Sequence, residues 1–274
     1  MSDAAAERRR VAPYYAGGSL RAKHELASAQ GAPDFVGWVL DQLLIPGSAR
    51  VLDAGAGWGR FTWPLIERFG LDPSRVVALD VFPDVAEQAR AAGEEHGHRI
   101  APVVADIAAL PFRDAAFDLV LANHVLYHVP ALEDGVRELR RVLRPTGTLM
   151  ATTNADDVPV AVFDCHRDAL RRLGLPVEPE RPSPFSLSNG EGVLRTVFAD
   201  VTLRVLEADF AYQTVGDFMA TYERTGTFRL AVESLRLRES TLLAAVRESA
   251  AERLAVHGRL PSSFKMGVFL CVSG

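Results

Sequence analysis

The stretch VLDAGAGWGR, residues 51–60, joins a short apolar run to three glycines at alternate positions, Gly55, Gly57 and Gly59. Glycine in place of alanine destabilises a helix or strand by roughly 0.5–1 kcal/mol, so three together indicate a special use. The apolar run predicts a buried strand at 50–54, and a helix is predicted at 60–69. We therefore expect a turn here at which a ligand approaches the main chain closely.

Strands and helices alternate on both sides of this turn. Further short apolar runs predict strands at 76–80, 102–105, 117–122, 147–153, 201–212 and 265–272, and helices are predicted between the first five strands at 60–69, 83–92 and 132–143. Short apolar strands joined by helices are typical of a parallel sheet covered on both faces. We expect an α/β fold with a doubly wound, mostly parallel seven-stranded sheet.

The segments outside this alternation are predicted to form a lid and two insertions around the core of the domain. Asp34 is placed to cap a helix at 34–44 that Pro46-Gly47 ends, and residues 1–45 are predicted to form an N-terminal helical lid with another helix at 20–29. The core is predicted at 46–154, 191–212 and 263–274. Residues 155–190 and 213–262 are predicted insertions that roof the substrate site, with helices at 156–173, 215–222 and 230–256, a loop at 174–190 and a short helix at 191–198.

Composition favours a soluble protein without a nucleic-acid partner. The 274 residues carry a formal net charge of −5, whereas phosphate binding favours a basic surface. Two distant cysteines give no disulfide framework or metal spacing, which fits a reducing compartment. Neither a signal peptide nor an apolar run of membrane-spanning length is apparent, so a cytoplasmic location without membrane contact is expected. The oligomeric state, monomer or homodimer, stays open.

Two classes of ligand compete for the glycine stretch. In an open parallel sheet, ligands bind beyond the carboxyl ends of the strands, where this turn is predicted. The dinucleotide fingerprint G-x-G-x-x-G/A fails here, because its third small residue falls on Arg60 when read from Gly55 and on Thr62 when read from Gly57. A pyrophosphate therefore matches the spacing poorly.

The stretch resembles motif I of the class I S-adenosylmethionine-dependent methyltransferases, acid-x-Gly-x-Gly-x-Gly, with Asp53 as the acid. Further motifs of that family follow in order. VVALDVF places Asp80 at the end of a strand, VVADIAALPF places Asp106 after the next, and FDLVLANHVLYHV is similar to the fourth-strand motif. LRRVLRPTGTLMATT resembles the following helix, turn and strand, with Thr146 where many relatives have glycine. The resemblance covers about residues 51–153 and is loose outside them.

The resemblance implies S-adenosyl-L-methionine as the cofactor. Asp80 would accept hydrogen bonds from both ribose hydroxyls, and Asp106 would accept from the adenine amino group while the Ile107 amide donates to a ring nitrogen. Phe82 and Ile107 would sandwich the adenine, although Phe82 before Pro83 would equally suit the core. Asp53 and the Asn123 carbonyl would hold the ammonium group. The residues implied in cofactor binding are Tyr15, Arg21, Asp53, Ala54, Gly55, Gly57, Asp80, Val81, Phe82, Asp106, Ile107, Asn123 and His124.

Candidate general bases cluster in ANHVLYHVP, where His124 follows Asn123 at the predicted strand end and His128 lies four residues on. Methyl transfer is chiefly a matter of aligning the acceptor, and a base removes its proton where one is needed. Histidine titrates in the useful range, so His124 and His128 are the catalytic hypotheses, against the alternative that they only shape the loop. A zinc site is not expected, because Val125 stands where H-E-x-x-H has glutamate.

The substrate side gives weaker signals. Tyr14, Tyr15 and Arg21 would contact the cofactor if the N-terminal segment is a lid, or would pack that lid onto the core. Asp156 and Asp157 follow the fifth strand, where two acids would suit a cationic acceptor or equally the start of a helix. We favour the helix interpretation of these two acids.

These observations predict methyl transfer to an amine or hydroxyl of a small molecule, for example a secondary metabolite such as an amino sugar or another intermediate of antibiotic biosynthesis. An RNA or protein methyltransferase is the alternative, although lysines and aromatic residues are not interleaved as nucleic-acid binding favours. A non-catalytic module that binds S-adenosylmethionine also stays open. A nicotinamide dehydrogenase would instead bind NAD.

Overall fold

A computed structural model describes residues 33–156, 160–177 and 183–272, and it divides them into two compact units. The sheet unit comprises the described residues of 34–156, 183–206 and 266–272. The helical unit comprises those of 160–177 and 207–265 together with Pro33. The predicted N-terminal helix at 20–29 lies outside the described residues.

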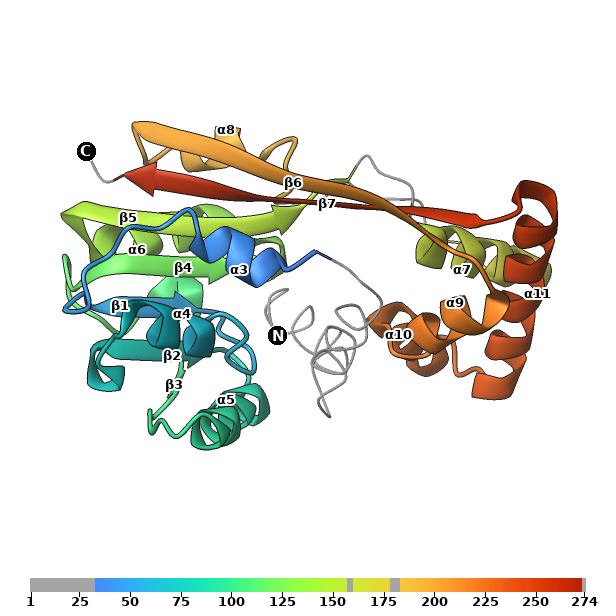
Figure 1. Ribbon diagram of the computed structural model, residues 1–274, viewed down its shortest axis with the longest axis horizontal. Coiled ribbons are helices and arrows are strands. Elements are labelled where there is room, and N and C mark those ends of the chain that lie inside the picture. The colour runs from blue at the N-terminus through green and yellow to red at the C-terminus, as the bar shows by residue number, and fades with distance from the viewer. Residues whose placement is uncertain (1–32, 157–159, 178–182, 273–274) are drawn as a thin grey trace. The chain divides into compact units, whose positions relative to one another are not determined.

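The sheet has seven strands in the order β3-β2-β1-β4-β5-β7-β6 (Figure 1). The first five strands pair in parallel, and β7 runs antiparallel to β5, which confirms the predicted doubly wound, mostly parallel sheet. The strands are β1 (Val51–Ala54), β2 (Val76–Asp80), β3 (Val103–Val104), β4 (Phe117–Asn123), β5 (Leu143–Asn154), β6 (Asp200–Tyr212) and β7 (Leu260–Val272).

Strand register brings the predicted site residues to one edge of the sheet. Asp53 in β1 pairs with Ala78 of β2 on one side and with Leu121 of β4 on the other. Asp80 at the end of β2 pairs with Val104 of β3. Because parallel strands end at the same edge, the loops after β1, β2, β3 and β4 all leave the sheet there.

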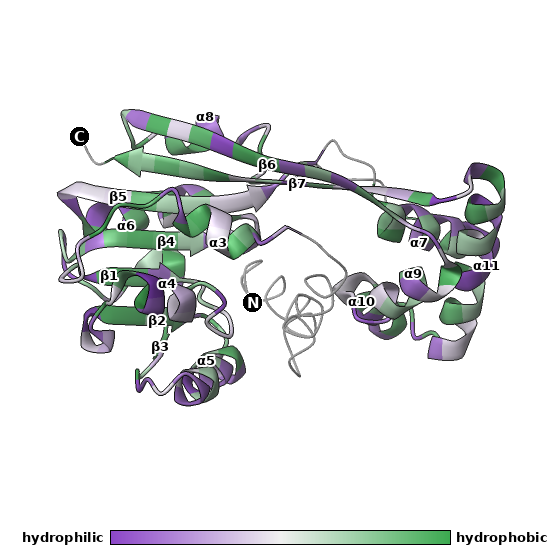
Figure 2. Ribbon diagram, viewed as in Figure 1, coloured by the Kyte–Doolittle hydropathy of each residue, from purple (hydrophilic) through white to green (hydrophobic). Residues whose placement is uncertain are grey.

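Helices cover both faces of the central strands. Leu52 and Ala54 of β1 belong to a buried core shared with Val136 and Leu139 on one face. The alternate residue Asp53 points to the opposite face, toward Thr62. The helices of this unit are α3 (Phe35–Leu40), α4 (Thr62–Phe69), α5 (Pro83–Glu95), α6 (Leu132–Val142) and α8 (Gly190–Leu194), with short 3-10 turns η2 (Pro73–Arg75), η3 (Ile107–Ala109) and η4 (Leu126–His128). β4 is hydrophobic along most of its length, as a strand covered on both faces should be (Figure 2).

Three element boundaries in the sheet unit differ from the sequence prediction by four residues, and the others there differ by less. α3 is capped by Asp34 as expected, because Gly37 N–H donates to Asp34 Oδ1 at 2.9 Å, but it ends at Leu40 rather than 44. β5 begins at Leu143, directly after α6 and four residues before the predicted start at Gly147, so Pro145 lies inside the strand and not in a turn before it. α8 ends at Leu194, four residues before the predicted end.

The helical unit has a buried core of its own. It contains α7 (Ala161–Arg172), α9 (Val215–Tyr222), α10 (Gly226–Ser234) and α11 (Glu239–His257), whose buried residues include Phe218, Tyr222 and Val246. A cavity of about 320 Å³ opens beside Asp164, Arg253 and His257. Within the described part of the chain, no helix is both long and apolar enough to cross a membrane.

The predicted single helix at 230–256 is wrong, because α10 and α11 are separate helices. α10 ends at Ser234, and Arg236 has the left-handed φ of 51°. Thr225 begins α10 by accepting the Phe228 N–H at 3.2 Å, which fixes that helix earlier along the chain than predicted. No glycine or proline marks this break in LRLRES, so the sequence pattern gave no signal of it.

A buried histidine should make the helical unit sensitive to acid. His166 Nδ1 lies 2.7 Å from the Tyr222 hydroxyl, and burial lowers the pKa of His166 from 6.5 to about 4. Between these values the unfolded chain binds a proton that the folded unit does not, so stability should fall by up to about 1.4 kcal/mol per pH unit as pH drops. Urea unfolding of wild type and His166→Gln at pH 7 and pH 5 measures the loss as the difference between the two proteins.

The control for this prediction is a second histidine of the same unit. His257 is exposed at the end of α11, so His257→Gln should keep the acid sensitivity that His166→Gln removes. An equal acid loss in wild type and His166→Gln would contradict the assignment.

Candidate active site

The glycine loop after β1 adopts backbone conformations that favour glycine. Gly55, Gly57 and Gly59 have φ values of 82°, 59° and 86°. A Cβ at Gly55 would lie 2.7 Å from Val125 Cβ, and one at Gly59 would lie 2.8 Å from Trp63 Cδ1. At Gly57, by contrast, no described atom lies within 4 Å of such a Cβ. Two of the glycines therefore permit close packing, and the third faces open space.

The Asp80 carboxylate is fixed by main-chain amides on two sides. Gly57 N–H donates to its Oδ2 at 3.1 Å, and Phe82 N–H donates to its Oδ1 at 3.0 Å. Burial raises the pKa of Asp80, while hydrogen bonding to the amides of Phe82, Gly57 and Val81 opposes the rise. A carboxylate offers about four lone-pair positions, so it can accept hydrogen bonds from the hydroxyls of a ligand as well.

Asp53 is a buried acid at the same edge of the sheet. It is 1% exposed, and the Thr62 hydroxyl donates to its Oδ2 at 2.6 Å. Its Oδ1 has no hydrogen-bond partner among the described residues. Burial, reinforced by the nearby Asp80 charge, raises the pKa of Asp53 from 3.8 to about 7, against the Thr62 hydrogen bond that lowers it. A positively charged partner would therefore be strongly favoured here.

The end of β4 places Asn123 and His124 beside β1. Asn123 is 7% exposed, and neither its Oδ1 nor its Nδ2 has a hydrogen-bond partner within the described segments. His124 has the left-handed φ of 51°, with its N–H donating to Thr152 O at 3.0 Å. Its ring lies 5.4 Å from that of Phe35. His128 ends η4, with its ring 4.3 Å from that of Tyr127.

The loop after β3 carries the predicted adenine contacts. Asp106 Oδ1 accepts the Ala108 N–H at 3.0 Å and so begins η3. Ala105 N–H donates to Asp80 O at 3.1 Å, which ties this loop to the end of β2. Ile107 is buried in the core, and Phe82, at the start of α5, is half-buried.

The structure thus brings together the predicted residues of the loops after β1, β2, β3 and β4, and it adds one that sequence reasoning missed. Thr62 was missed as the donor to Asp53, although a hydroxyl in the first turn after a glycine loop is a usable signal. Arg60 directly follows the glycine loop. Its guanidinium carbon lies 5.6 Å from the Phe61 ring centroid, and burial lowers its pKa from 12.5 to about 10.

Other predicted residues have a different outcome. Tyr14, Tyr15 and Arg21 lie outside the described residues, as does Asp157. Asp156 does not begin the following helix as we favoured, because α7 starts at Ala161 after Val160. Its Oδ2 instead accepts the Ser188 hydroxyl at 3.1 Å.

Comparison with known proteins identifies the sheet and its loops. Residues 52–151 match a family described as "Methyltransferase domain". This range runs from β1 to β5 and contains the glycine loop, Asp80, Asp106 and Asn123. Residues 52–151 form a methyltransferase domain. The resemblance to class I S-adenosylmethionine-dependent methyltransferases is therefore confirmed over the range where the motifs lie.

Relatives of the methyltransferase domain extend the comparison. A malonyl-[acyl-carrier protein] O-methyltransferase of Enterobacter lignolyticus is 36% identical over 170 residues, which cover 61% of this chain and 57% of that protein. The chain spans about half the length of the first curated relatives that it matches.

Two solved structures share the fold. A Bacillus halodurans protein proposed to be a methyltransferase has a TM-score of 0.60 at 19% identity, covering 88% of this chain and 99% of that one. The [4+2]-cyclase SpnF has a TM-score of 0.55 at 18% identity, covering 89% and 82%. At such identities the likeness shows the fold alone.

The methyltransferase domain has buried polar groups that suit the cofactor of its family. Asp53 Oδ1 and the Asn123 amide are buried without hydrogen-bond partners among the described residues, and such atoms favour a ligand that supplies them. The open space at Gly57 adjoins the Asp80 carboxylate. Among the described residues, no group of three or more His, Cys, Asp or Glu side chains is placed to hold a metal ion.

Proposed function

We propose that this protein transfers a methyl group from S-adenosylmethionine to an amine or hydroxyl group of a small molecule. The arrangement of Asp80 carries the proposal. Two amides hold its carboxylate at the end of β2, with lone pairs left for the two neighbouring hydroxyls of a ribose. Gly57, which supplies one of these amides, is also the glycine that faces open space, so a nucleoside can lie against the main chain.

The amino-acid end of the cofactor would lie beside β1 and β4. Asp53 and the Asn123 amide supply buried acceptors there, and an ammonium group is a donor that would satisfy them. The adenine end would lie by the loop after β3, with the Asp106 carboxylate and the Ile107 amide as its polar partners. These placements follow the order of the strands, since β1 lies between β4 and β2.

The protein's task in the reaction is alignment of the acceptor. The cofactor supplies a methyl group already activated by a positive sulfur, so binding an acceptor in line with it contributes most of the catalysis. His124, at the end of β4 beside Asn123, is our candidate for the base that takes the acceptor's proton, and His128 is the second. A His124→Ala variant with unchanged turnover across pH would remove His124 from the mechanism.

A small-molecule acceptor is supported by the relatives and by charge. The Enterobacter lignolyticus relative is named an O-methyltransferase, which favours an oxygen acceptor over nitrogen. The net charge of −5 disfavours an RNA substrate. A secondary metabolite such as an amino sugar is one acceptor of this size.

Binding and methyl transfer test the proposal together. S-adenosylmethionine and S-adenosylhomocysteine should each bind, whereas NAD should not, and a ligand at 100 times its Kd should stabilise the fold by about 2.7 kcal/mol. Because SpnF shares the fold and is a cyclase, the assay should follow labelled methyl from the cofactor to amine, hydroxyl and carboxylate acceptors. Wild-type protein that binds NAD but neither adenosyl ligand would overturn the proposal.

Asp80→Ala should weaken binding of both adenosyl ligands by about a hundredfold, because it removes two charge-assisted hydrogen bonds to the ribose. Calorimetric titration measures the change. Asp84→Ala is the matched control, since Asp84 is an exposed acid in the first turn of α5. Equal affinities in wild type and Asp80→Ala would show that the ribose lies elsewhere.

A further inference from the structure

The loop that carries the predicted adenine contacts has little regular structure of its own. It connects β3, which is only two residues long, to β4, and it contains only the single turn η3. Within it, Asp106 caps η3 through the Ala108 N–H. An aligned carboxylate and amide in such a segment need support from a neighbouring element.

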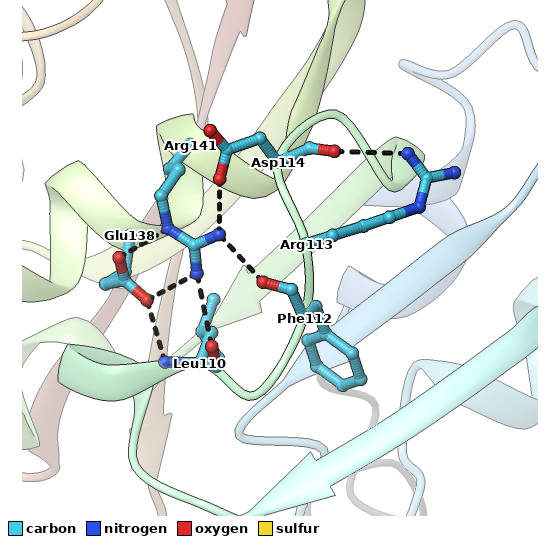
Figure 3. Close-up of polar contacts among 6 residues, drawn as sticks. All are labelled: Leu110, Phe112, Arg113, Asp114, Glu138 and Arg141. Atoms are coloured by element: carbon cyan, nitrogen blue, oxygen red, sulfur yellow. Dashed lines mark hydrogen bonds and ion pairs between the residues drawn. The ribbon is translucent and has the colours of Figure 1, made fainter.

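That support comes from Glu138 and Arg141 on α6 (Figure 3). Arg141 Nη2 donates to Leu110 O at 3.1 Å, and its Nη1 donates to Phe112 O at 2.7 Å. Nη1 also donates to the Asp114 carboxylate at 2.7 Å. One guanidinium thus holds three residues of the loop that follow η3.

Glu138 completes the network from the same helix face. Its Oε2 accepts the Leu110 N–H at 2.8 Å and Arg141 Nη2 at 2.7 Å, while its Oε1 accepts Arg141 Nε at 2.7 Å. The two parallel bonds between the side chains fix the plane of the guanidinium. Both the N–H and the C=O of Leu110 are therefore bound to α6 side chains.

Within this network the Arg141–Glu138 pair is more sheltered than the ion pairs of Arg137 on the same helix, while the side chain of Asp114 is 79% exposed. The side chains of Arg141 and Glu138 are 30% and 22% exposed, whereas those of Arg137 and Glu133 are 58% and 85% exposed. Hydrogen bonds from Arg141, followed by one from the Leu110 amide, lower the pKa of Glu138 despite its burial. Charged hydrogen bonds to main-chain groups in such a place are stronger than exposed ion pairs.

The main chain and the core link the same helix to both ends of the loop. Ala115 N–H donates to Arg141 O at 3.0 Å, and Ala116 N–H donates to Val142 O at 2.8 Å. At the other end, Ile107 Cγ2 would be 3.3 Å from a Cβ on Gly135. Movement of the loop away from α6 would therefore break contacts from Ile107 to Ala116.

We infer that Arg141, oriented by Glu138, is a positioning residue that fixes the loop after β3 and thereby sets the site's discrimination for adenine. The inference rests on the proposed function, because it needs Asp106 and Ile107 to contact the adenine. Arg141 does not itself touch the base. It acts on the loop residues beyond η3 and so limits how far the Asp106 carboxylate and the Ile107 amide can move.

A comparison of two nucleosides tests this role. S-adenosylhomocysteine carries the adenine amino group from which Asp106 would accept a hydrogen bond. Its hypoxanthine counterpart has an oxygen in place of that amino group, and its protonated ring nitrogen cannot accept the hydrogen bond from the Ile107 amide. A site built for hydrogen bonds rejects an analogue that cannot form them, so wild type should bind the adenine form at least about tenfold more tightly. Arg141→Ala should bring this ratio close to one.

The ratio separates positioning from general destabilisation. A variant that is only less stable loses affinity for both nucleosides alike and keeps the wild-type ratio. Arg137→Ala is the matched control, because Arg137 lies one turn earlier on α6 in an exposed ion pair with Asp134. It should leave both affinities and their ratio unchanged. An Arg141→Ala protein that keeps the wild-type ratio would overturn the inference.

Further measurements keep the test decisive if Arg141→Ala folds poorly. Arg141→Lys keeps the charge but not the planar fork, so it should give an intermediate ratio. Hydrogen exchange should quicken at the Leu110 amide in Glu138→Gln, with β1 and β4 unchanged, and unchanged exchange at Leu110 would also contradict the inference. If wild-type protein binds neither nucleoside, the proposed function is refuted, and the inference about Arg141 with it. If wild type binds both and Arg141→Ala keeps the wild-type ratio of the two affinities, only the inference about Arg141 is refuted.

Discussion

Asp53→Asn should stabilise the ligand-free protein above pH 7 and at the same time weaken its binding of S-adenosylmethionine. The stabilising effect follows from the pKa of the buried Asp53, which is raised from 3.8 to about 7 chiefly by burial. Between these values the folded protein keeps a proton that the unfolded chain has lost. Stability therefore falls as pH rises through this window, and the full penalty is present above it.

The size of the gain is bounded by the same shift. A pKa difference from 3.8 to about 7 corresponds to at most about 4 kcal/mol, and a gain of about 2 kcal/mol at pH 8 is expected after relaxation around the neutral amide. Asparagine can still accept the Thr62 hydroxyl that now donates to Asp53. Urea unfolding at pH 8 and pH 5 measures the effect, which should shrink at the lower pH.

The loss of cofactor binding in Asp53→Asn arises because the ionised carboxylate, which destabilises the ligand-free protein, is the form that attracts the ammonium group. A cationic group near Asp53 favours its ionised form, so the wild-type Kd for the cofactor should rise by up to about tenfold per pH unit below pH 7. Asp53→Asn should bind about tenfold or more weakly at pH 8. It should also lose this pH dependence, leaving only the part that belongs to Asp80, whose pKa is raised as well.

An acid at the other end of the sheet provides the control. Asp118 accepts the Arg50 N–H at 2.8 Å and pairs with Arg144, so Asp118→Asn should destabilise the fold and leave cofactor affinity unchanged. An Asp53→Asn variant that is less stable than wild type at pH 8 would show that the buried carboxylate does not destabilise the ligand-free protein. A gain in stability without a loss of affinity would place the ammonium group elsewhere.

The sheet could be predicted closely because its strands are marked by local signals. Val76–Asp80 is a short apolar run that begins after the Pro73 turn and ends before Pro83, and its observed bounds equal the predicted ones. β5 was predicted to start too late because Pro145 is an ordinary turn residue. Its inclusion in the strand depends on pairing with β4, where Phe117 aligns with Leu143 before the register shifts, and no periodicity of the sequence reveals such a pairing.

The site residues that could be predicted from the sequence are those whose spacing along the chain matches a known motif. The acid and glycines of residues 53–59 and the acid at the end of β2 are such signals, and the structure places them in hydrogen-bond contact through Gly57 and Asp80. The Arg141 network was not predictable, because its partners Leu110, Phe112 and Asp114 lie 31, 29 and 27 residues away. In the sequence, Arg141 is one of two adjacent arginines on an amphipathic helix, and only the fold distinguishes them.

The three glycines of residues 55–59 should respond differently to alanine, and Gly57 and Gly59 give the sharpest contrast. Gly59→Ala should destabilise the protein by about 3 kcal/mol, as the sum of a left-handed backbone and an overpacked contact. The added Cβ would lie 2.8 Å from Trp63 Cδ1. Trp63 has little room to retreat, because it is fully buried and packs so closely on Gly93 that a Cβ there would lie only 2.9 Å from its Cζ2.

Gly57→Ala should leave most of the stability and remove most of the binding. Its φ of 59° costs an alanine about 1 kcal/mol, and no described atom lies within 4 Å of the new Cβ. That Cβ would enter the space beside Asp80 in which the nucleoside is proposed to lie, so affinity for S-adenosylhomocysteine should fall by about tenfold or more. Thermal melting and calorimetric titration of both variants separate the two effects. If Gly57→Ala binds as wild type does, the open space at Gly57 is not where the ligand lies, and the glycine serves the turn alone.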